Sequence, residues 1–195
     1  MITDIQAATV PRHLDADELA AGLEEIRRSP KNAGTVQMIV ARPQAEQRCI
    51  LERAELSPQQ GLTGDRWRST SWLKLPDDMP DPAVQITLMN ARCIELVAGG
   101  RVHWHLAGDN LFVDLDLSIE NLPTGARLAL GECVLEISEP PHTGCAKFKR
   151  RFGNAAFLFV NSLEGKALRL RGVHARVVHA GVVSVGDLVT RCERV

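Results

Sequence analysis

Short stretches of alternating apolar and polar residues, separated by glycine turns, dominate the chain from residue 34 onward. The clearest stretch is 111–117, where leucine and valine alternate with Phe112 and two aspartates. A two-residue period is typical of a strand with one face toward a core and one toward solvent. Because seven or eight such strands are expected with few helices between them, the sequence predicts a mainly β fold. The expected form is a closed or nearly closed, mostly antiparallel β-barrel with a few peripheral helices, rather than a doubly wound sheet.

The strands and helices can be placed by their patterns. Strands are expected at residues 36–40, 48–56, 83–88, 111–117, 127–130, 133–137, 173–179 and 182–189. Asp15 or Asp17 can cap an amphipathic helix that ends near Arg28, and Asn90 can cap another that stops at Gly99. From Asn154 through Ser162 a short helix is favoured over a strand. These patterns divide the chain into an N-terminal helical arm, residues 1–33, and a barrel domain, residues 34–195.

Composition excludes several classes of protein. The 23 lysines and arginines balance 24 acidic residues, so the chain is not a dedicated nucleic-acid binder. The longest apolar stretch, residues 155–160, is too short to cross a membrane, and no leader pattern begins the chain. Five cysteines form no CxxC pair and leave one over from any disulfide scheme. A cytoplasmic, soluble protein without structural disulfides is therefore expected.

One cysteine stands apart from the others. Cys145 lies in residues 140–153, a segment that begins with two prolines, contains Lys147, Arg150 and Arg151, and has no acidic residue. Nearby cations favour the thiolate, which is the form that attacks substrates and binds soft metals. The remaining cysteines are in phase with apolar neighbours or near the end of the chain. The sequence therefore predicts a loop that presents one chemically active thiol.

Two other stretches are candidates for ligand contact. In GLTGD, residues 61–65, the glycines would let backbone approach a ligand, although a plain turn with a surface ion pair between Asp65 and Arg66 is the default interpretation. Residues 68–82 contain three prolines and three aspartates and predict a long loop of the kind that forms lids or binding loops.

The residues alone leave the role of Cys145 open. It could be a nucleophile with His142 as its base, but the segment shows no third residue to orient the histidine. The barrel could instead be a non-enzymatic protein whose basic loop binds anions or another protein, with the cysteine incidental.

A set of motifs in order along the chain resembles the MOSC domain, found in molybdenum cofactor sulfurases, the mitochondrial amidoxime-reducing component and stand-alone bacterial proteins. The motifs are GLTGD, AVQITLMNA at 83–91, GDNL at 108–111, LPTGARLALGECVLEI at 122–137, PHTGCAKFKRRFG at 141–153 and RGVHARVVHAGVVSVGD at 171–187. The resemblance covers residues 34–195 and implies a β-barrel that binds a molybdopterin-type molybdenum cofactor. Its functional cysteine corresponds to Cys145.

The resemblance implies two functions. In the first, the protein is an oxidoreductase of small substrates, N-hydroxylated ones among them, with Cys145 as the catalytic residue and molybdenum ligand. The cofactor would then be held by the nearby residues Arg66, His142, Lys147, Arg150 and Arg151. In the second, Cys145 carries a persulfide and transfers sulfur. Family members that reduce N-hydroxylated compounds tend to have arginine and proline just before the cysteine, where this chain has His142, Thr143 and Gly144. A separate electron-donor or sulfur-donor protein would be the partner.

Overall fold

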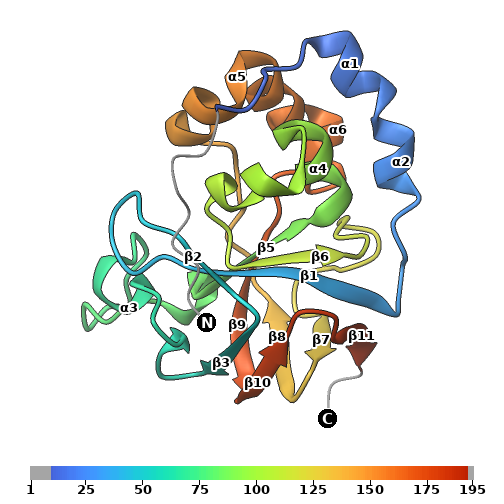
Figure 1. The fold of residues 1–195 in the computed structure, drawn as a ribbon. Helices are drawn as coiled ribbons and strands as arrows, with labels where there is room; N and C mark the ends of the chain where they lie inside the picture. The colour runs from blue at the N-terminus through green and yellow to red at the C-terminus, as the bar shows by residue number, and fades with distance from the viewer. Residues whose placement is uncertain (1–9, 193–195) are drawn as a thin grey trace.

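Seven strands close on themselves into a barrel in the computed structural model, which describes residues 10–192 (Figure 1). The strand order is β11-β7-β8-β9-β5-β6-β1, and antiparallel pairing of β11 with β1 closes the circle. Every pair is antiparallel except β5 with β6, which run parallel because a helical crossover connects them. The predicted closed, mostly antiparallel barrel is confirmed.

The barrel strands are β1 (Gly34–Ala41), β5 (Ile86–Asn90), β6 (Leu111–Asp114), β7 (Arg127–Leu130), β8 (Cys133–Ile137), β9 (Val173–His179) and β11 (Leu188–Cys192). A short strand, β2 (Cys49–Leu51), pairs antiparallel with the end of β1. A small second sheet is formed by β3 (Arg53–Ser57), β4 (Gly61–Leu62) and β10 (Gly181–Ser184). The helices are α1 (Ala16–Ala21), α2 (Leu23–Arg27), α3 (Trp67–Thr70), η1 (Pro82–Val84), α4 (Ala91–Ala98), η2 (Arg101–Ala107), α5 (Ala146–Asn161) and α6 (Leu163–Ala167).

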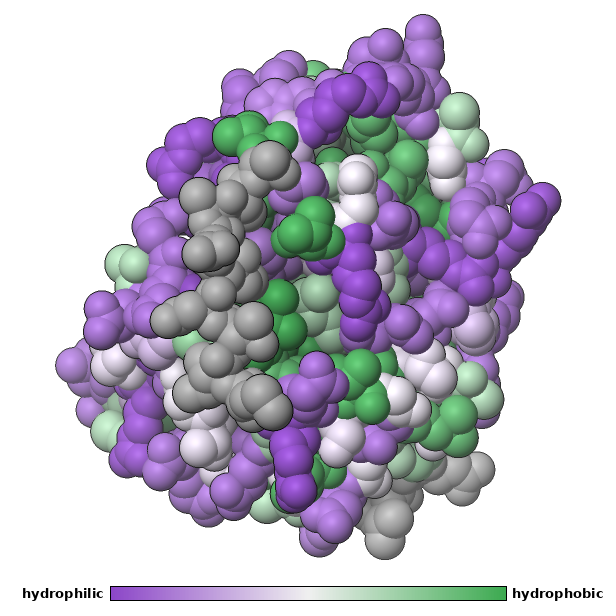
Figure 2. All heavy atoms as spheres, viewed as in Figure 1, coloured by the Kyte–Doolittle hydropathy of each residue, from purple (hydrophilic) through white to green (hydrophobic). Residues whose placement is uncertain are grey.

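The apolar residues form two cores. One fills the barrel and includes Leu88, Leu111 and Leu135, while the other lies between the barrel and its helices and includes Phe112 and Phe152. In Figure 1 the helices α4, α5 and α6 gather over one side of the barrel. On the face shown in Figure 2, apolar residues appear as separate patches among hydrophilic ones.

The expected strand at 111–117 differs from the structure in two respects. It ends at Asp114, and the face that carries Phe112 is not wet, because that side chain is fully buried beneath the helices. Asp114, expected to be solvated, is about a quarter exposed and accepts a hydrogen bond from Arg92 Nε at 2.8 Å. The alternation failed as a guide because a barrel strand covered by helices is buried on both faces.

The N-terminal helical region begins as predicted. Asp15 accepts from the backbone N–H of Glu18, and the Glu18 side chain accepts from the backbone of Asp15, which forms a capping box. Gly22 then divides the region into α1 and α2. Leu19 and Ile26 bury their side chains in the core beneath the helices. No helix within residues 10–192 has the length and hydrophobicity needed to span a membrane.

The segment 140–153 is only partly a loop. Helix α5 begins at Ala146, well before the expected cap at Asn154, and it bends at Gly153, whose φ of 90° lies outside the helical region. Phe148 and Phe152 lie four residues apart and are fully buried, with ring centroids 4.8 Å apart. Such a pair stabilises a helix, and here it outweighs the loop character that the prolines and glycines indicated.

Candidate functional site

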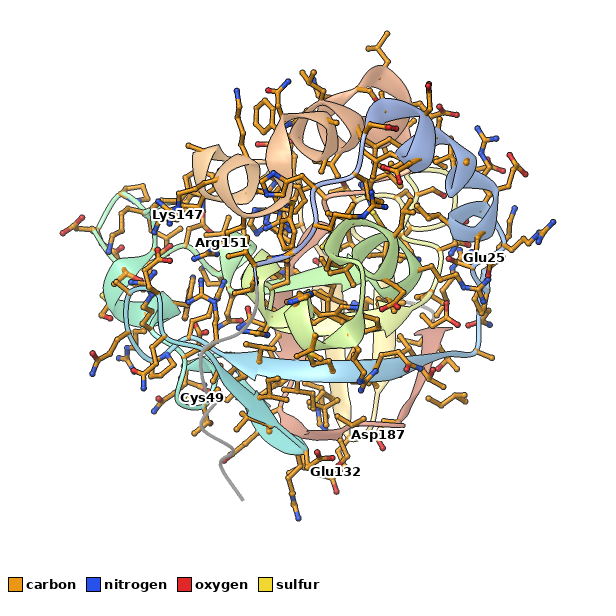
Figure 3. The ribbon with its side chains drawn as sticks, turned by 45° about the horizontal axis from the view of Figure 1, so that its top comes forward. Glu25, Cys49, Glu132, Lys147, Arg151 and Asp187 are labelled. Atoms are coloured by element: carbon orange, nitrogen blue, oxygen red, sulfur yellow. The ribbon has the colours of Figure 1, made fainter. Side chains whose placement is uncertain are left out.

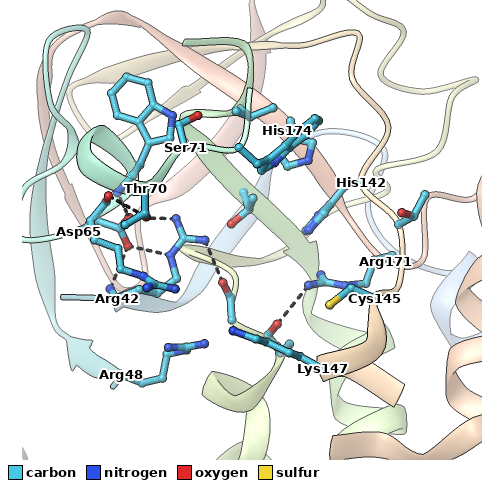
Figure 4. Close-up of a pocket in the computed structure, with 18 of the residues that line it drawn as sticks. Arg42, Arg48, Asp65, Thr70, Ser71, His142, Cys145, Lys147, Arg171 and His174 are labelled. Carbon is cyan, nitrogen blue, oxygen red and sulfur yellow. Dashed lines mark hydrogen bonds and ion pairs between the residues drawn. The ribbon is translucent and has the colours of Figure 1, made fainter. Parts of the chain in front are cut away.

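A cavity of about 430 Å³ lies at one end of the barrel (Figure 4). Its walls come from the end of β1, the loop before β2, the start of α3, the end of η2, the start of α5 and the start of β9. Thr70, Ser71 and Trp72, from the stretch predicted to be a binding loop, line it as well. Six cations border the cavity: Arg42, Arg48, Arg66, Lys147, Arg151 and Arg171.

Asp65 of the GLTGD motif holds Arg42 against this wall. Its Oδ2 accepts from Arg42 Nε at 2.7 Å, and its Oδ1 accepts from Arg42 Nη2 at 3.0 Å. Burial raises the pKa of Asp65, but the hydrogen bonds and charge of Arg42 outweigh burial, so the pKa lies below its usual value. The prediction of a surface ion pair between Asp65 and Arg66 was wrong. The Asp65 side chain is only 1% exposed, and its partner is Arg42.

Arg48 has no carboxylate at ion-pair distance among residues 10–192. Burial lowers the pKa of its guanidinium to about 10, and the positive charges of Arg151 and Arg42 act in the same direction. Its Nη1 donates to the Gln47 carbonyl at 2.7 Å, whereas its buried Nε has no hydrogen-bond partner in the described structure. Positive charge gathered this closely favours an anionic ligand.

A buried polar cluster forms the opposite wall. Arg171 Nη1 donates to Asp109 Oδ2 at 2.6 Å, and the other oxygen of Asp109 lies 3.5 Å from His142 Nδ1. The rings of His142 and His174 have centroids 4.5 Å apart. Burial, assisted by the charge of Arg171, lowers the pKa of His142 well below its usual value and that of His174 to about 4. Both imidazoles are therefore neutral near pH 7.

Cys145 is exposed and lines the cavity at the N-cap of α5. Its side chain makes no capping hydrogen bond. No hydrogen bond joins it to His142 in the described structure, so the arrangement does not form the nucleophile and base pair considered from sequence. Asp109 is the carboxylate beside His142 that the sequence did not reveal. It could orient the imidazole, but the histidine itself makes no hydrogen bond to Cys145 in the described structure.

Three basic residues of α5 share one anionic partner from another segment. The Glu46 carboxylate forms ion pairs with Lys147, Nζ to Oε1 at 3.3 Å, and with Arg150, Nη2 to Oε2 at 3.5 Å. It also pairs with Arg151. Arg151 is mostly buried and donates to the Leu106 carbonyl at 2.7 Å. Figure 3 shows Lys147 and Arg151 together at one end of the molecule.

The residues proposed from sequence to hold a cofactor therefore fall into two groups, those at the cavity and one away from it. Arg66, His142, Lys147 and Arg151 border the cavity, whereas Arg150 is 66% exposed and is not part of its lining. Sequence analysis missed four basic residues of the wall: Arg42, Arg48, Arg171 and His174. Arg171 and His174 belong to the RGVHARV motif, which could have indicated them, whereas Arg42 and Arg48 belong to no motif.

The chemistry of this lining fits an anionic ligand with many hydrogen-bonding atoms. Several buried polar atoms have no partner in the described residues: Arg48 Nε, Trp67 Nε1, His142 Nδ1, Arg171 Nε and His174 Nδ1. Buried polar groups are normally satisfied, so unpartnered ones beside a cavity indicate ligand contacts. The volume is also in the range of small-molecule sites.

Solved structures share this fold. YiiM from Escherichia coli is 19% identical with a TM-score of 0.52, and the match covers 83% of this chain and 71% of that protein. The YuaD protein from Bacillus subtilis is 14% identical with a TM-score of 0.57, covering 83% of this chain and 97% of that one. No curated protein sequence matches the chain significantly.

A match to a family model, rather than to a single structure, shows the family of this chain. The model of the MOSC domain matches residues 86–190, more than half of the 195 residues. That region includes Asp109, His142, Cys145, Arg171 and His174, and so supplies one wall of the cavity. The chain belongs to the MOSC domain family, which is linked to molybdenum-cofactor binding.

Proposed function

We propose that the cavity binds a molybdopterin-type molybdenum cofactor, with the Cys145 thiolate as the protein ligand to molybdenum. The observation that carries this proposal is that Cys145 lines the same cavity as six cations. It is also the one exposed cysteine of the five. A thiolate is a soft ligand suited to a redox metal, and a cluster of guanidinium groups suits a phosphate.

Ion pairing within the protein supports a choice among these cations for the phosphate. Arg42 forms an ion pair with Asp65, and Arg171 forms one with Asp109. Lys147 and Arg151 both pair with Glu46. In the described structure, Arg48 and Arg66 are the lining cations without a carboxylate partner. A phosphate between them would offset the mutual repulsion of these guanidinium groups, so we assign it to this pair.

The remaining wall would hold the rest of the cofactor. The unpartnered nitrogen atoms of Trp67, His142 and His174 offer hydrogen bonds to a polar heterocycle. The bound cofactor would supply redox chemistry at its metal to a small substrate, N-hydroxylated compounds included. Electrons would come from a separate donor protein.

Metal and pterin analysis tests the proposal. We expect protein from a cofactor-competent host to contain molybdenum and pterin near stoichiometry. Cys145→Ser should lose most of the molybdenum, Arg48→Gln with Arg66→Gln should lose both components, and Cys49→Ser should lose neither. Metal-free wild-type protein without pterin fluorescence would reject the cofactor.

A second function, sulfur transfer, is favoured by the exposure of Cys145 at the open edge of the cavity. In that function Cys145 carries a persulfide whose outer sulfur passes to an acceptor. Intact mass after incubation with a sulfur-donor protein should show the increment of one sulfur atom. An increment that persists in Cys145→Ser would exclude this cysteine as the carrier.

A further inference from the structure

A second cavity, of about 420 Å³, shares a wall with the first. Pro141, His142, Thr143 and His174 line both cavities. The rest of the second cavity comes from Ile119, the segment just after β8, the C-terminal part of α5, α6 and the turn that leads into β9. Cys145 does not line it, so the second cavity is chemically distinct from the proposed cofactor site.

Two cations border this second cavity without an ionic partner. Lys166 is exposed on α6, and Arg169 is half-buried in the turn that follows. Within residues 10–192, neither has a carboxylate at ion-pair distance, although Glu139 also lines the cavity. Arg169 donates from Nη1 to the Leu122 carbonyl, which leaves the other end of its guanidinium fork free. Burial without a compensating carboxylate lowers the pKa of Arg169.

The backbone at Arg169 is unusual for an arginine. Its φ of 49° lies in the left-handed region, which costs a non-glycine residue about 1 kcal/mol. Hydrogen bonds from Leu170 N–H to the Gly165 carbonyl at 2.8 Å and from Gly172 N–H to the Arg169 carbonyl at 2.7 Å hold the turn. Glycine would form this turn without strain, so contacts of the arginine side chain, among them its hydrogen bond to the Leu122 carbonyl, offset the strain.

The remaining lining is both polar and apolar. Ser138 Oγ is buried and has no hydrogen-bond partner in the described structure. Ile119, Val160 and Val173 supply the apolar surface. Such a lining suits a molecule with one charged end and an apolar body.

We propose that the second cavity binds a small organic carboxylate. Arg169 and Lys166 receive the carboxylate group, the Ser138 hydroxyl donates to it, and the apolar part of the ligand packs on Val160 and Val173. Arginine suits this role because its planar fork can hold both oxygens of a carboxylate. The proposal does not depend on a cofactor in the first cavity.

Calorimetric titration with benzoate tests the proposal, and benzamide is its uncharged control. We expect benzoate to bind in the millimolar range or tighter and benzamide to bind at least tenfold more weakly. Arg169→Gly suits the left-handed backbone, so circular dichroism should show a folded protein. It should weaken benzoate binding about tenfold or more, because a hydrogen bond to a charged group is lost. Arg28→Gln, a surface arginine outside both cavities, should bind benzoate as the wild type does.

Other outcomes would overturn the proposal. No benzoate binding, or equal binding of benzamide, would show that the second cavity does not recognise a carboxylate. Binding that is lost in Arg66→Gln but retained in Arg169→Gly would place the anion in the first cavity. Loss of binding in Arg28→Gln would show only non-specific charge attraction.

Discussion

Asp65→Asn should destabilise the protein by removing the charge that holds Arg42 at the cavity wall. Asp65 Oδ2 accepts from Arg42 Nε at 2.7 Å, from the Arg42 backbone N–H at 2.9 Å and from Asn110 Nδ2 at 3.0 Å. Oδ1 accepts from the Trp67 N–H at 2.9 Å. An asparagine that keeps its oxygen toward Trp67 would place its NH₂ group, itself a donor, at the position of Oδ2. The two Arg42 donors and the Asn110 donor would then lose their acceptor.

The expected loss in free energy of unfolding is about 3 kcal/mol. Breaking a buried ion pair from one side costs about 3–5 kcal/mol, and the lower end applies because the Arg42 side chain is 18% exposed. Because the pKa of Asp65 is depressed in the folded protein, its stabilising contribution is complete above its unfolded pKa. That contribution is lost as the pH falls through the folded pKa.

Urea unfolding of the wild type and Asp65→Asn at pH 7 measures this loss in free energy of unfolding. Repeating the measurement at decreasing pH tests whether the loss comes from the ionised carboxylate of Asp65. The difference between the two proteins should narrow as the pH falls below about 4. Asp114→Asn is the matched control, because Asp114 pairs with Arg92 near the surface and should contribute less than about 1 kcal/mol. A loss of under about 1 kcal/mol in Asp65→Asn, or a difference independent of pH, would refute the reasoning.

Three further predictions concern single residues. Gly172→Ala should lower the melting temperature, because φ is 110° there and an added Cβ would lie 2.1 Å from the Leu88 carbonyl oxygen; an unchanged melting temperature would contradict this. The ring of His174 should show no titration by NMR between pH 5 and 8, because its pKa is about 4, and a midpoint near 6.5 would disprove its burial. Since its folded pKa lies below the unfolded one, its contribution to stability should be lost as the pH falls from about 6.5 toward 4. Iodoacetamide should modify Cys145 in the native protein but Cys93 only after unfolding, because burial raises the pKa of Cys93 to about 12; mass mapping would show the order.

Local patterns predicted the elements whose cause is local. Asp15 and Asn90 cap helices as expected, and Gly99 ends α4 in the left-handed conformation, because these hydrogen bonds and dihedral angles involve neighbours in the chain. Alternation predicted β8 and β9 with their observed bounds. It misjudged β6 because a two-residue period cannot show that helices cover the outer face of a strand.

The candidate site divides in the same way. Cys145 could be singled out from sequence because its neighbours are charged, whereas the other cysteines fit apolar patterns or lie near the end of the chain. Its setting could not, since Asp65 pairs with Arg42 and Asp109 contacts both Arg171 and His142, all across long separations in the chain. Sequence position also made Arg150 and Arg151 look equivalent, although only Arg151 borders the cavity.

The sequence by itself determined the barrel class, the caps of α1 and α4, and the one cysteine without a packing role. The tertiary structure alone decided which charges meet. Closure of β11 onto β1 completes the barrel whose end carries the cavity, and the pairing of Arg42, Arg171, Lys147 and Arg151 leaves Arg48 and Arg66 free. The physical reason is that a period or a cap depends on residues within one turn or strand, whereas the charge of a cavity depends on every segment that reaches it.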